Sequence, residues 1–304
     1  MECAPMNQSA TGRKRGKNDL LGWAVLGSGR AGTIRARDIQ ASPEHRLVSH
    51  VGGRQGEGAL QRAVRDPDVD AVAVCLANAE HAKWSRFAVE AGKDVLVEFP
   101  LCASERQARE LFSLASARGR LAHDEIIGLL TASHSVRQAQ MASGQASRIE
   151  VSFQGGLYRW VAQEAMEGRV GQLAMGRLQA LDQLCGRLRV EQVSCRSEQG
   201  GYVLTASLQS ADGVSIELKE SRWPGLKRAS QWRIVDDRGE ELGSAPTTVA
   251  AGGLFERDLQ VFRRRRDGDH AAAYVSTLDV ISVQRIADII SAQAHWRPQV
   301  SAVS

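Results

Sequence analysis

The chain has 304 residues, 43% of them hydrophobic and 24% charged, and its 39 basic and 35 acidic residues give a net charge of +4. This length allows one large domain or two ordinary ones with a sizeable core, and so modest a charge argues against a nucleic-acid partner. No run of eighteen apolar residues occurs, so we expect no membrane span and a cytoplasmic protein.

The N-terminal residues 1–18 contain the basic run GRKRGK, and we expect this tail to be disordered. The five cysteines are scattered and form neither a CxxC pair nor another metal-ligand spacing. We therefore predict reduced thiols, no disulfide and no metal at Cys3, Cys75, Cys102, Cys185 and Cys195.

Ordered sequence is expected to begin near Leu20, where the strand pattern LLGWAVLG leads directly into GSGRAGTIRARDIQAS. Gly27, Gly29 and Gly32 give the spacing G-x-G-x-x-G between a strand and a helix. In that setting the glycines allow a tight turn, close approach of a pyrophosphate and packing of helix on strand, and the helix N-terminus favours an anion. The segment therefore predicts a dinucleotide-binding loop.

The next strand, HRLVSHVGGR, favours NADP(H) over NAD(H). Folds specific for NAD carry an acid at the end of this strand for the ribose hydroxyls, whereas this strand ends in Gly52, Gly53 and Arg54. An arginine without an acid beside it can pair with a 2′-phosphate. We expect NADPH as the cofactor, with weaker binding of NADH.

Strands and helices continue to alternate through ALQRAVRDP, VDAVAVCLA, NAEHAKWSRFAVEAG, DVLVEFP and a helix with Ser104 as its N-cap, and RLAHDEIIGLL predicts a short strand running into another helix. This order predicts a parallel sheet, so residues 19–125 should form an α/β Rossmann domain. From Arg148 onwards, segments from RIEVSFQGGLYRW to SQWRIVDDRG read as strands, followed by helices near GGLFERDLQVFRRRR and at 276–294. Residues 126–304 should form an α+β domain with a mostly antiparallel sheet.

Ligands of open α/β sheets bind beyond the carboxyl ends of the strands. In this chain those ends carry the glycine loop, Arg54, the Ala77 segment and the tripeptide Glu98-Phe99-Pro100. The cofactor-binding residues predicted from these positions are Gly27, Ser28, Gly29, Arg30, Ala31, Gly32, Arg54, Ala77, Asn78, His81 and Glu98.

The motifs VLGSGRAGTIRARD, ANAEH, EAGKDVLVEFP and LAHDEIIGLL resemble, in order and spacing, the glucose-fructose oxidoreductase and inositol dehydrogenase family. That family has a hallmark Glu-Lys-Pro whose lysine acts as general acid or base in sugar oxidation. Phe99 stands in the lysine's place and cannot take that role. The Asp and His that the sugar dehydrogenases carry on a later helix are also missing, and Arg177 lies in the matching stretch.

One branch of this family, the biliverdin reductases, resembles the chain more closely. The similarity covers the G-x-G-R-A-G loop with Arg35 to Asp38, the tripeptide at Glu98 to Pro100, which is Glu-Tyr-Pro in this branch, the segment His123 to Glu125, the pair Cys185-Gly186 after Arg177, and PGLKR. It implies NADPH-dependent hydride transfer to the central methine carbon of the tetrapyrrole biliverdin, which needs no alcohol to be deprotonated. Phe99 departs from the tyrosine of this branch and leaves the proton donor unassigned.

The resemblance implies roles for individual residues. Arg177 would hold a propionate or organise protonation, Glu98 would orient the cofactor, and Phe99 would pack on the reacting rings. Glu125 is either a carboxylate near the pyrroles or a helix N-terminal acid, and His123 in the same segment has no single assigned role. We predict Arg177, Glu98, Phe99 and Glu125 as catalytic residues and Arg177, Lys227, Arg228 and Arg233 as substrate-binding residues; the histidines at 45, 50, 134, 270 and 295 are expected to be bystanders.

Two alternatives stay open. The chain could be another NADP-dependent oxidoreductase of the sugar-dehydrogenase family, which Phe99 and the missing Asp and His disfavour. It could also be a sensor or scaffold that binds NADP(H) without turnover, an interpretation that the change from tyrosine to Phe99 keeps open.

Overall fold

The computed structural model describes residues 20–243 and 252–296. The predicted disordered tail and Cys3 lie outside these ranges. Within them, Cys75, Cys102, Cys185 and Cys195 are free thiols, and no group of three or more histidine, cysteine or acidic side chains is placed to hold a metal ion. No helix of the described chain is long and apolar enough to cross a membrane.

The first half of the chain forms the parallel sheet that the alternating pattern predicts. Its five strands lie in the order β2-β1-β3-β4-β5, and every neighbouring pair runs parallel. The strands are β1 (Leu21–Leu26), β2 (His45–Val51), β3 (Ala71–Val74), β4 (Asp94–Val97) and β5 (Ala122–Asp124). Because β1, β3 and β4 are buried throughout, their sequences are continuous apolar runs rather than alternating ones.

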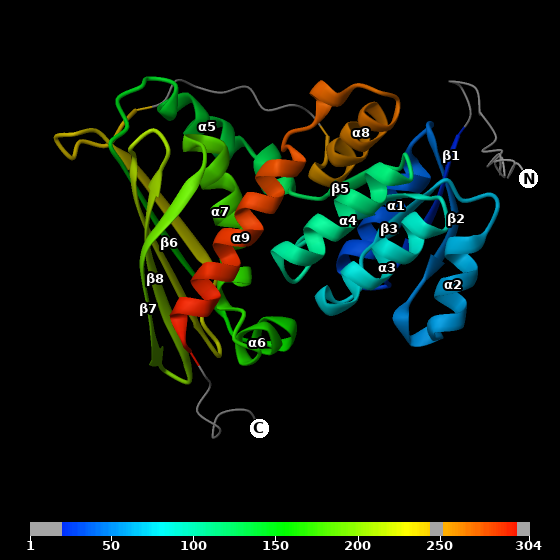
Figure 1. Ribbon diagram of the computed structural model, residues 1–304, viewed down its shortest axis with the longest axis horizontal. Helices are drawn as coiled ribbons and strands as arrows, with labels where there is room; N and C mark the ends of the chain where they lie inside the picture. Colours follow the sequence, from blue (N-terminus) through cyan, green and yellow to red (C-terminus); the bar gives the residue numbers. More distant parts are fainter. Residues whose placement is uncertain (1–19, 244–251, 297–304) are drawn as a thin grey trace, which may run out of the picture.

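Helices cover both faces of this sheet. One face packs against α1 (Arg30–Ala41) and α8 (Leu254–Arg266), and the other packs against α2 (Glu57–Arg65), α3 (Asn78–Glu90) and α4 (Glu105–Ala117). Helix α4 begins as predicted, because the Ser104 hydroxyl accepts a hydrogen bond from the Gln107 amide. Helix α8 therefore lies on the first sheet although its sequence follows the second (Figure 1).

The second sheet is mixed and mostly antiparallel, as the sequence predicts. Its order is β10-β6-β9-β8-β7, and only β6 and β9 run parallel to each other. The strands are β6 (Arg148–Gly156), β7 (Leu188–Glu198), β8 (Gly201–Ser210), β9 (Ser215–Trp223) and β10 (Ala229–Val235). The predicted boundary near residue 125 coincides with the end of β5 and stays a prediction.

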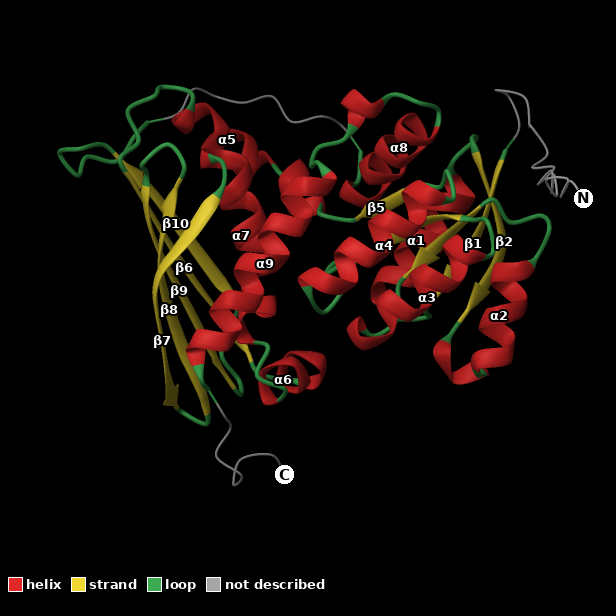
Figure 2. Ribbon diagram, in the orientation of Figure 1, coloured by secondary structure: helices red, strands yellow, loops and turns green. Residues whose placement is uncertain are grey.

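The remaining helices lie on one face of the second sheet, between it and the first (Figure 2). They are α5 (Ala132–Met141), α6 (Arg159–Met166), α7 (Val170–Cys185) and α9 (Thr277–Ala294). The strand predicted for RIEVSFQGGLYRW is too long, because β6 ends at Gly156 and α6 begins at Arg159. Helix α9 begins one residue after the predicted start, with Ser276 as its N-cap.

Helix α9 contributes to two separate cores. From Val283 onwards, α9 places Val283, Ile286 and Ile290 in the core under the second sheet. Its N-terminal half places Val280 and Ile281 in the core between the first sheet and α4. The helix therefore joins the two halves of the molecule through buried apolar contacts.

Candidate active site

The glycine loop has the geometry that the three glycine positions require. Gly27 has φ of +119°, and a Cβ there would lie 2.0 Å from the Cys75 carbonyl oxygen. A Cβ on Gly32 would lie 1.9 Å from the Gly27 oxygen, so this glycine lets α1 pack on β1. Gly29 faces open space within 4 Å, and α1 starts at the next residue with no acid in its first turn. The loop can therefore receive a pyrophosphate.

The turn after β2 adjoins this loop. A Cβ on Gly52 would lie 2.5 Å from the Ser28 hydroxyl oxygen, so only a glycine allows the turn to approach so closely. Arg54 lies in the short 3-10 helix that follows and is exposed. Its guanidinium has no hydrogen-bond or ion-pair partner in the described part of the chain, and it is therefore available to an external anion.

A histidine that the sequence treats as a bystander supports the loop. The His50 ring, on β2, lies 2.9 Å from the Gly27 carbonyl oxygen through Nε2, which donates in the tautomer protonated there. The contact ties β2 to the first glycine. Ala77 is the N-cap of α3, and Asn78 is its first residue.

His81 is buried rather than open to a ligand. Its Nδ1 lies 2.7 Å from the Pro100 carbonyl oxygen, and its Nε2 lies 3.1 Å from the Leu76 carbonyl oxygen. Burial lowers the pKa of this imidazole, so the neutral ring has one N–H to donate. The ring therefore lies between the ends of β3 and β4 and donates to one of these two carbonyls.

Glu98 and Glu125 lie side by side at the strand ends. Val74, Val97 and Asp124 are register partners on β3, β4 and β5, and the Glu98 and Glu125 amides continue these ladders. Glu98 and Glu125 each lie one residue beyond these register partners, on the face of the sheet that α1 covers. Glu125 thus ends a strand and is not a helix N-terminal acid.

Burial raises the pKa of both carboxyl groups at this row. Desolvation raises the pKa of Glu98 to about 7, with Arg35 opposing the shift. Desolvation also raises the pKa of Glu125, and the neighbouring Glu98 adds to the effect. One oxygen of each, Oε2 of Glu98 and Oε1 of Glu125, is buried without a hydrogen-bond partner in the described chain. The pair can therefore retain protons near neutral pH.

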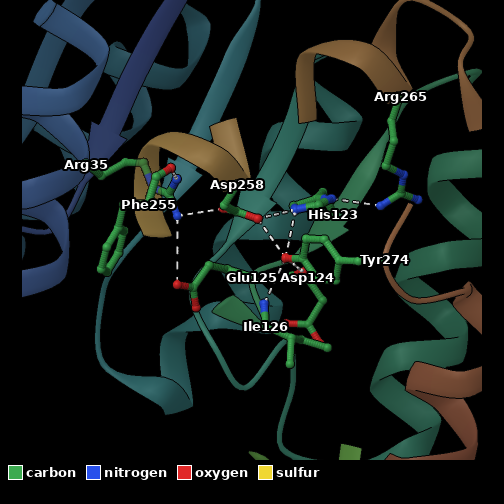
Figure 3. A network of polar contacts seen from close by, with 9 residues as sticks. All are labelled: Arg35, His123, Asp124, Glu125, Ile126, Phe255, Asp258, Arg265 and Tyr274. Carbon is green, nitrogen blue, oxygen red and sulfur yellow. Dashed lines mark hydrogen bonds and ion pairs between the residues drawn. The ribbon is translucent and has the colours of Figure 1, made fainter. Parts of the chain in front are cut away.

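Arg35, on α1, places a positive charge near the Glu98 and Glu125 carboxyl groups. Its fully buried guanidinium donates to Asp258 Oδ2 at 2.8 Å and to the Phe255 carbonyl at 2.9 Å, and it lies 4.0 Å from Glu125 Oε1. Asp258 and Phe255 belong to α8, so a single arginine joins α1, β5 and α8 (Figure 3).

Asp258 organises the other side of this network. Its Oδ1 lies 2.7 Å from His123 Nε2 and accepts a hydrogen bond from the Tyr274 hydroxyl, also at 2.7 Å. Arg265 donates to His123 Nδ1, so the neutral His123 ring donates to Asp258 through Nε2 (Figure 3). The Tyr274 hydroxyl also accepts from the Ile126 amide. His123 is therefore part of the scaffold that fixes the end of β5.

Phe99 lies where the two halves of the molecule join, against the α7 residue that precedes Arg177. Phe99 packs against the cores of both sheets, and its ring would lie 3.9 Å from a Cβ on Gly176 of α7. Arg177 is the next residue of that helix, and its side chain is 13% exposed. Arg177 is therefore not an exposed arginine on the helix surface.

The guanidinium of Arg177 is held on the inner face of the second sheet. It donates to the Leu173 carbonyl and to Glu220 on β9, and it stacks 4.2 Å from the centre of the Phe153 ring. Arg222 donates to the same carboxylate, at 2.7 Å. Neither Glu220 nor Arg222 was predicted, although their spacing of two residues on a strand places both on one face.

The structure separates the three predicted substrate-binding residues that follow β9, Lys227, Arg228 and Arg233. Arg228 lies 5.7 Å from the Phe153 ring centre and joins the group around Arg177. Lys227 is exposed. Arg233 pairs with Glu150 at 2.7 Å, and these two residues are register partners. Since their neighbours Ile149 and Ile234 fill the core, Arg233 points to the opposite face of the sheet, and the structure does not bring it together with Arg177.

Comparisons with known proteins agree with this architecture. Residues 21–125 match the oxidoreductase family described by its NAD-binding Rossmann fold. The chain is 28% identical to biliverdin reductase A of Mus musculus over 83% of this chain and 88% of that protein. It is 25% identical to biliverdin reductase A of Homo sapiens over 80% of this chain and 84% of that protein.

Two solved structures share the whole fold. Biliverdin reductase from Synechocystis sp. PCC 6803, in complex with biliverdin and NADP+, has a TM-score of 0.73 at 21% identity and covers 91% of this chain and 99% of its own. A 3-ketoreductase from Actinomadura kijaniata in complex with NADP has a TM-score of 0.73 at 20% identity and covers 91% and 98%. At these identities the structures show the fold alone.

Proposed function

Through residues 21–125 the chain belongs to the Rossmann oxidoreductase family that includes glucose-fructose oxidoreductase and inositol dehydrogenase, and from this premise we propose that it reduces biliverdin to bilirubin with NADPH. The alignments of this chain with the two relatives named biliverdin reductase A cover more than four fifths of each relative's length. That coverage supports a shared reaction, which the residues of the site must then account for.

The observation that carries the proposal is that Phe99 lies against α7 at the residue just before Arg177. At the strand end where the sugar dehydrogenases of the family have a lysine, this chain offers an apolar ring against α7, with a guanidinium on the adjoining residue. Such a pair suits a flat, conjugated substrate with carboxylates better than a sugar hydroxyl that must be deprotonated.

The residues at the strand ends also fit the proposed cofactor. The open side of Gly29 suits a pyrophosphate, and the unpartnered, exposed Arg54 suits a 2′-phosphate. When bound, NADPH supplies the hydride. The buried carboxyls of Glu98 and Glu125 would orient the cofactor and retain a proton close to the substrate, since Phe99 cannot donate one.

The first experiment is a visible spectrum of the purified protein with biliverdin and NADPH, with NADH in a parallel cuvette. We expect loss of the red absorbance of biliverdin and gain of a yellow product, faster with NADPH. Tight NADPH binding without conversion would support the sensor alternative. NADPH oxidation by sugar ketones but not by biliverdin would support a sugar-type oxidoreductase.

Arg177→Ala tests the observation on which the proposal depends. If the guanidinium stabilises charge that develops on the tetrapyrrole, turnover should fall by roughly ten- to a thousandfold, as for loss of one preorganised donor. NADPH affinity should stay unchanged. Turnover equal to that of the unmodified protein would remove Arg177 from the mechanism.

A further inference from the structure

We propose that Arg222 is a second substrate-binding residue, which together with Arg177 grips a carboxylate of the substrate, and that Glu220 positions both guanidinium groups. This inference rests on the proposed reduction of biliverdin. It concerns a cluster on β6, β9 and α7, composed of Phe153, Arg177, Glu220 and Arg222, of which the resemblance to known families indicated only Arg177.

The cluster is built around one buried carboxylate. Glu220 has no exposed side-chain surface, and its two oxygens accept from different arginines, Oε1 from Arg222 and Oε2 from Arg177. The arginine side chains are 10% and 13% exposed. Glu220 therefore fixes the direction in which both guanidinium groups point.

The charges of the cluster do not balance. Two nearly buried guanidinium groups face one carboxylate, and Arg228 adds a third cation at the exposed rim. A buried charge without a partner is costly, so an anion that enters here recovers part of that cost. Unused N–H groups remain for it, because Arg177 Nε is buried without a partner in the described chain, and no hydrogen bond there uses Arg222 Nη1 or Nη2.

An aromatic ring forms the base of the cluster. The guanidinium carbons of Arg177 and Arg222 lie 4.2 Å and 4.6 Å from the centre of the Phe153 ring. Stacking restricts both groups and leaves their N–H edges as the directions for binding. A planar guanidinium edge matches a carboxylate or a phosphate, and biliverdin supplies the former while a sugar nucleotide supplies the latter.

The cluster also lies close to the expected reaction centre. A Cβ on Gly176, which precedes Arg177 on α7, would lie 3.9 Å from the Phe99 ring. A carboxylate held by Arg177 and Arg222 would therefore keep the attached ring system near Phe99. We expect a substrate with free carboxylates to bind far better than its esters.

The test is a spectroscopic titration of the protein, saturated with NADP+, with biliverdin, biliverdin dimethyl ester and thymidine diphosphate. Arg222→Gln should weaken biliverdin binding by roughly ten- to a hundredfold, the range for hydrogen bonds to a charged partner. It should leave the already weak binding of the ester and the affinity for NADP+ unchanged. Arg222→Lys, which keeps the charge without the planar guanidinium, should lose less affinity for biliverdin than Arg222→Gln.

Two further variants separate positioning from general damage. Glu220→Gln should weaken binding of biliverdin but not of its dimethyl ester, because both arginines lose the anchor that directs them at a carboxylate. The matched control is Arg196→Gln on β7, which breaks another arginine–glutamate pair with a spacing of two residues, but at a side chain that is 67% exposed. It should bind all three ligands as the unmodified protein does.

The outcomes distinguish this inference from the proposed function. Equal loss of diacid and ester binding in Arg222→Gln, or no loss, would overturn the role of Arg222 even if biliverdin is reduced. Biliverdin binding that depends on Arg222 without any turnover would uphold the cluster and reject the reaction. Binding of thymidine diphosphate alone, lost in Arg222→Gln, would keep an anion site but overturn its assignment to a carboxylate.

Discussion

At the scale of single residues, the cofactor preference depends on Arg54. Its exposed guanidinium has no partner in the described chain and follows the β2 end where NAD-specific folds have an acid. Arg54→Glu should weaken the binding of NADPH by about ten- to a hundredfold and the binding of NADH far less, since the change places a negative charge beside the 2′-phosphate. Fluorescence titration with both nucleotides measures the effect.

The control for this substitution is Arg106→Glu on α4, where the side chain is 76% exposed and paired with Glu110. It makes the same change of charge far from the glycine loop. Equal weakening of NADPH and NADH in Arg54→Glu would exclude a 2′-phosphate contact, because only one of the two nucleotides carries that group.

Glu98 should make the stability of the protein depend on pH. Its folded-state pKa is about 7 against an ordinary 4.5, so the folded protein holds this proton more tightly than the unfolded chain does. The stabilisation that protonated Glu98 gives the folded protein is fully present below pH 4.5 and is lost as the pH rises through 7. Relative to Glu98→Gln, the free energy of unfolding of the unmodified protein should fall by on the order of 2 kcal/mol between pH 5 and pH 8.

Urea denaturation of both proteins across this pH range gives the measurement. Glu90→Gln on α3 is the control, since Glu90 is exposed and pairs with Arg86, and its curve should run parallel to that of the unmodified protein. A constant difference between Glu98→Gln and the unmodified protein at every pH would show that Glu98 titrates normally.

At the scale of elements, α8 is held on the first sheet by a buried ion pair. Asp258→Asn would remove the negative charge that Arg35 contacts and leave the buried guanidinium with Glu125, 4.0 Å away, as the nearest acid. We expect a loss of about 3–5 kcal/mol in the free energy of unfolding. Tryptophan fluorescence during urea denaturation reports it, because Trp23 packs against Phe262 of α8.

The double variant Arg35→Met with Asp258→Leu separates charge from packing. It removes both ions, so it should be more stable than Asp258→Asn although it changes more atoms. If the double variant is the less stable of the two, the pair contributes net attraction and the argument from an uncompensated charge fails.

The same elements show what a sequence can predict. The order of strands and helices follows from local signals such as the glycine loop and Ser104, so the predicted parallel sheet and its mixed neighbour were confirmed. The face of Arg233 depends on its register with Glu150, and a shift of one residue reverses every side chain. The Glu220 cluster and the Arg35 network join distant segments, and only tertiary structure brings those together.

At the scale of the whole molecule, α9 should make the two halves unfold together. Its buried side chains fill the cores of both sheets, so the helix cannot leave one core without disturbing the other. This coupling keeps Phe99 of the first half against Gly176 of the second. The site at the junction therefore depends on a helix that contributes none of its predicted residues.

Ile290→Ala tests this coupling from a distance. Ile290 is fully buried under the second sheet, and its truncation should cost about 2–5 kcal/mol. If unfolding is cooperative, hydrogen exchange of slow amides should accelerate by the same free energy in β8 and in β3, although Ile290 lies only in the core under the second sheet. Acceleration confined to β8 would mean that the first sheet unfolds on its own and that α9 does not couple the two halves.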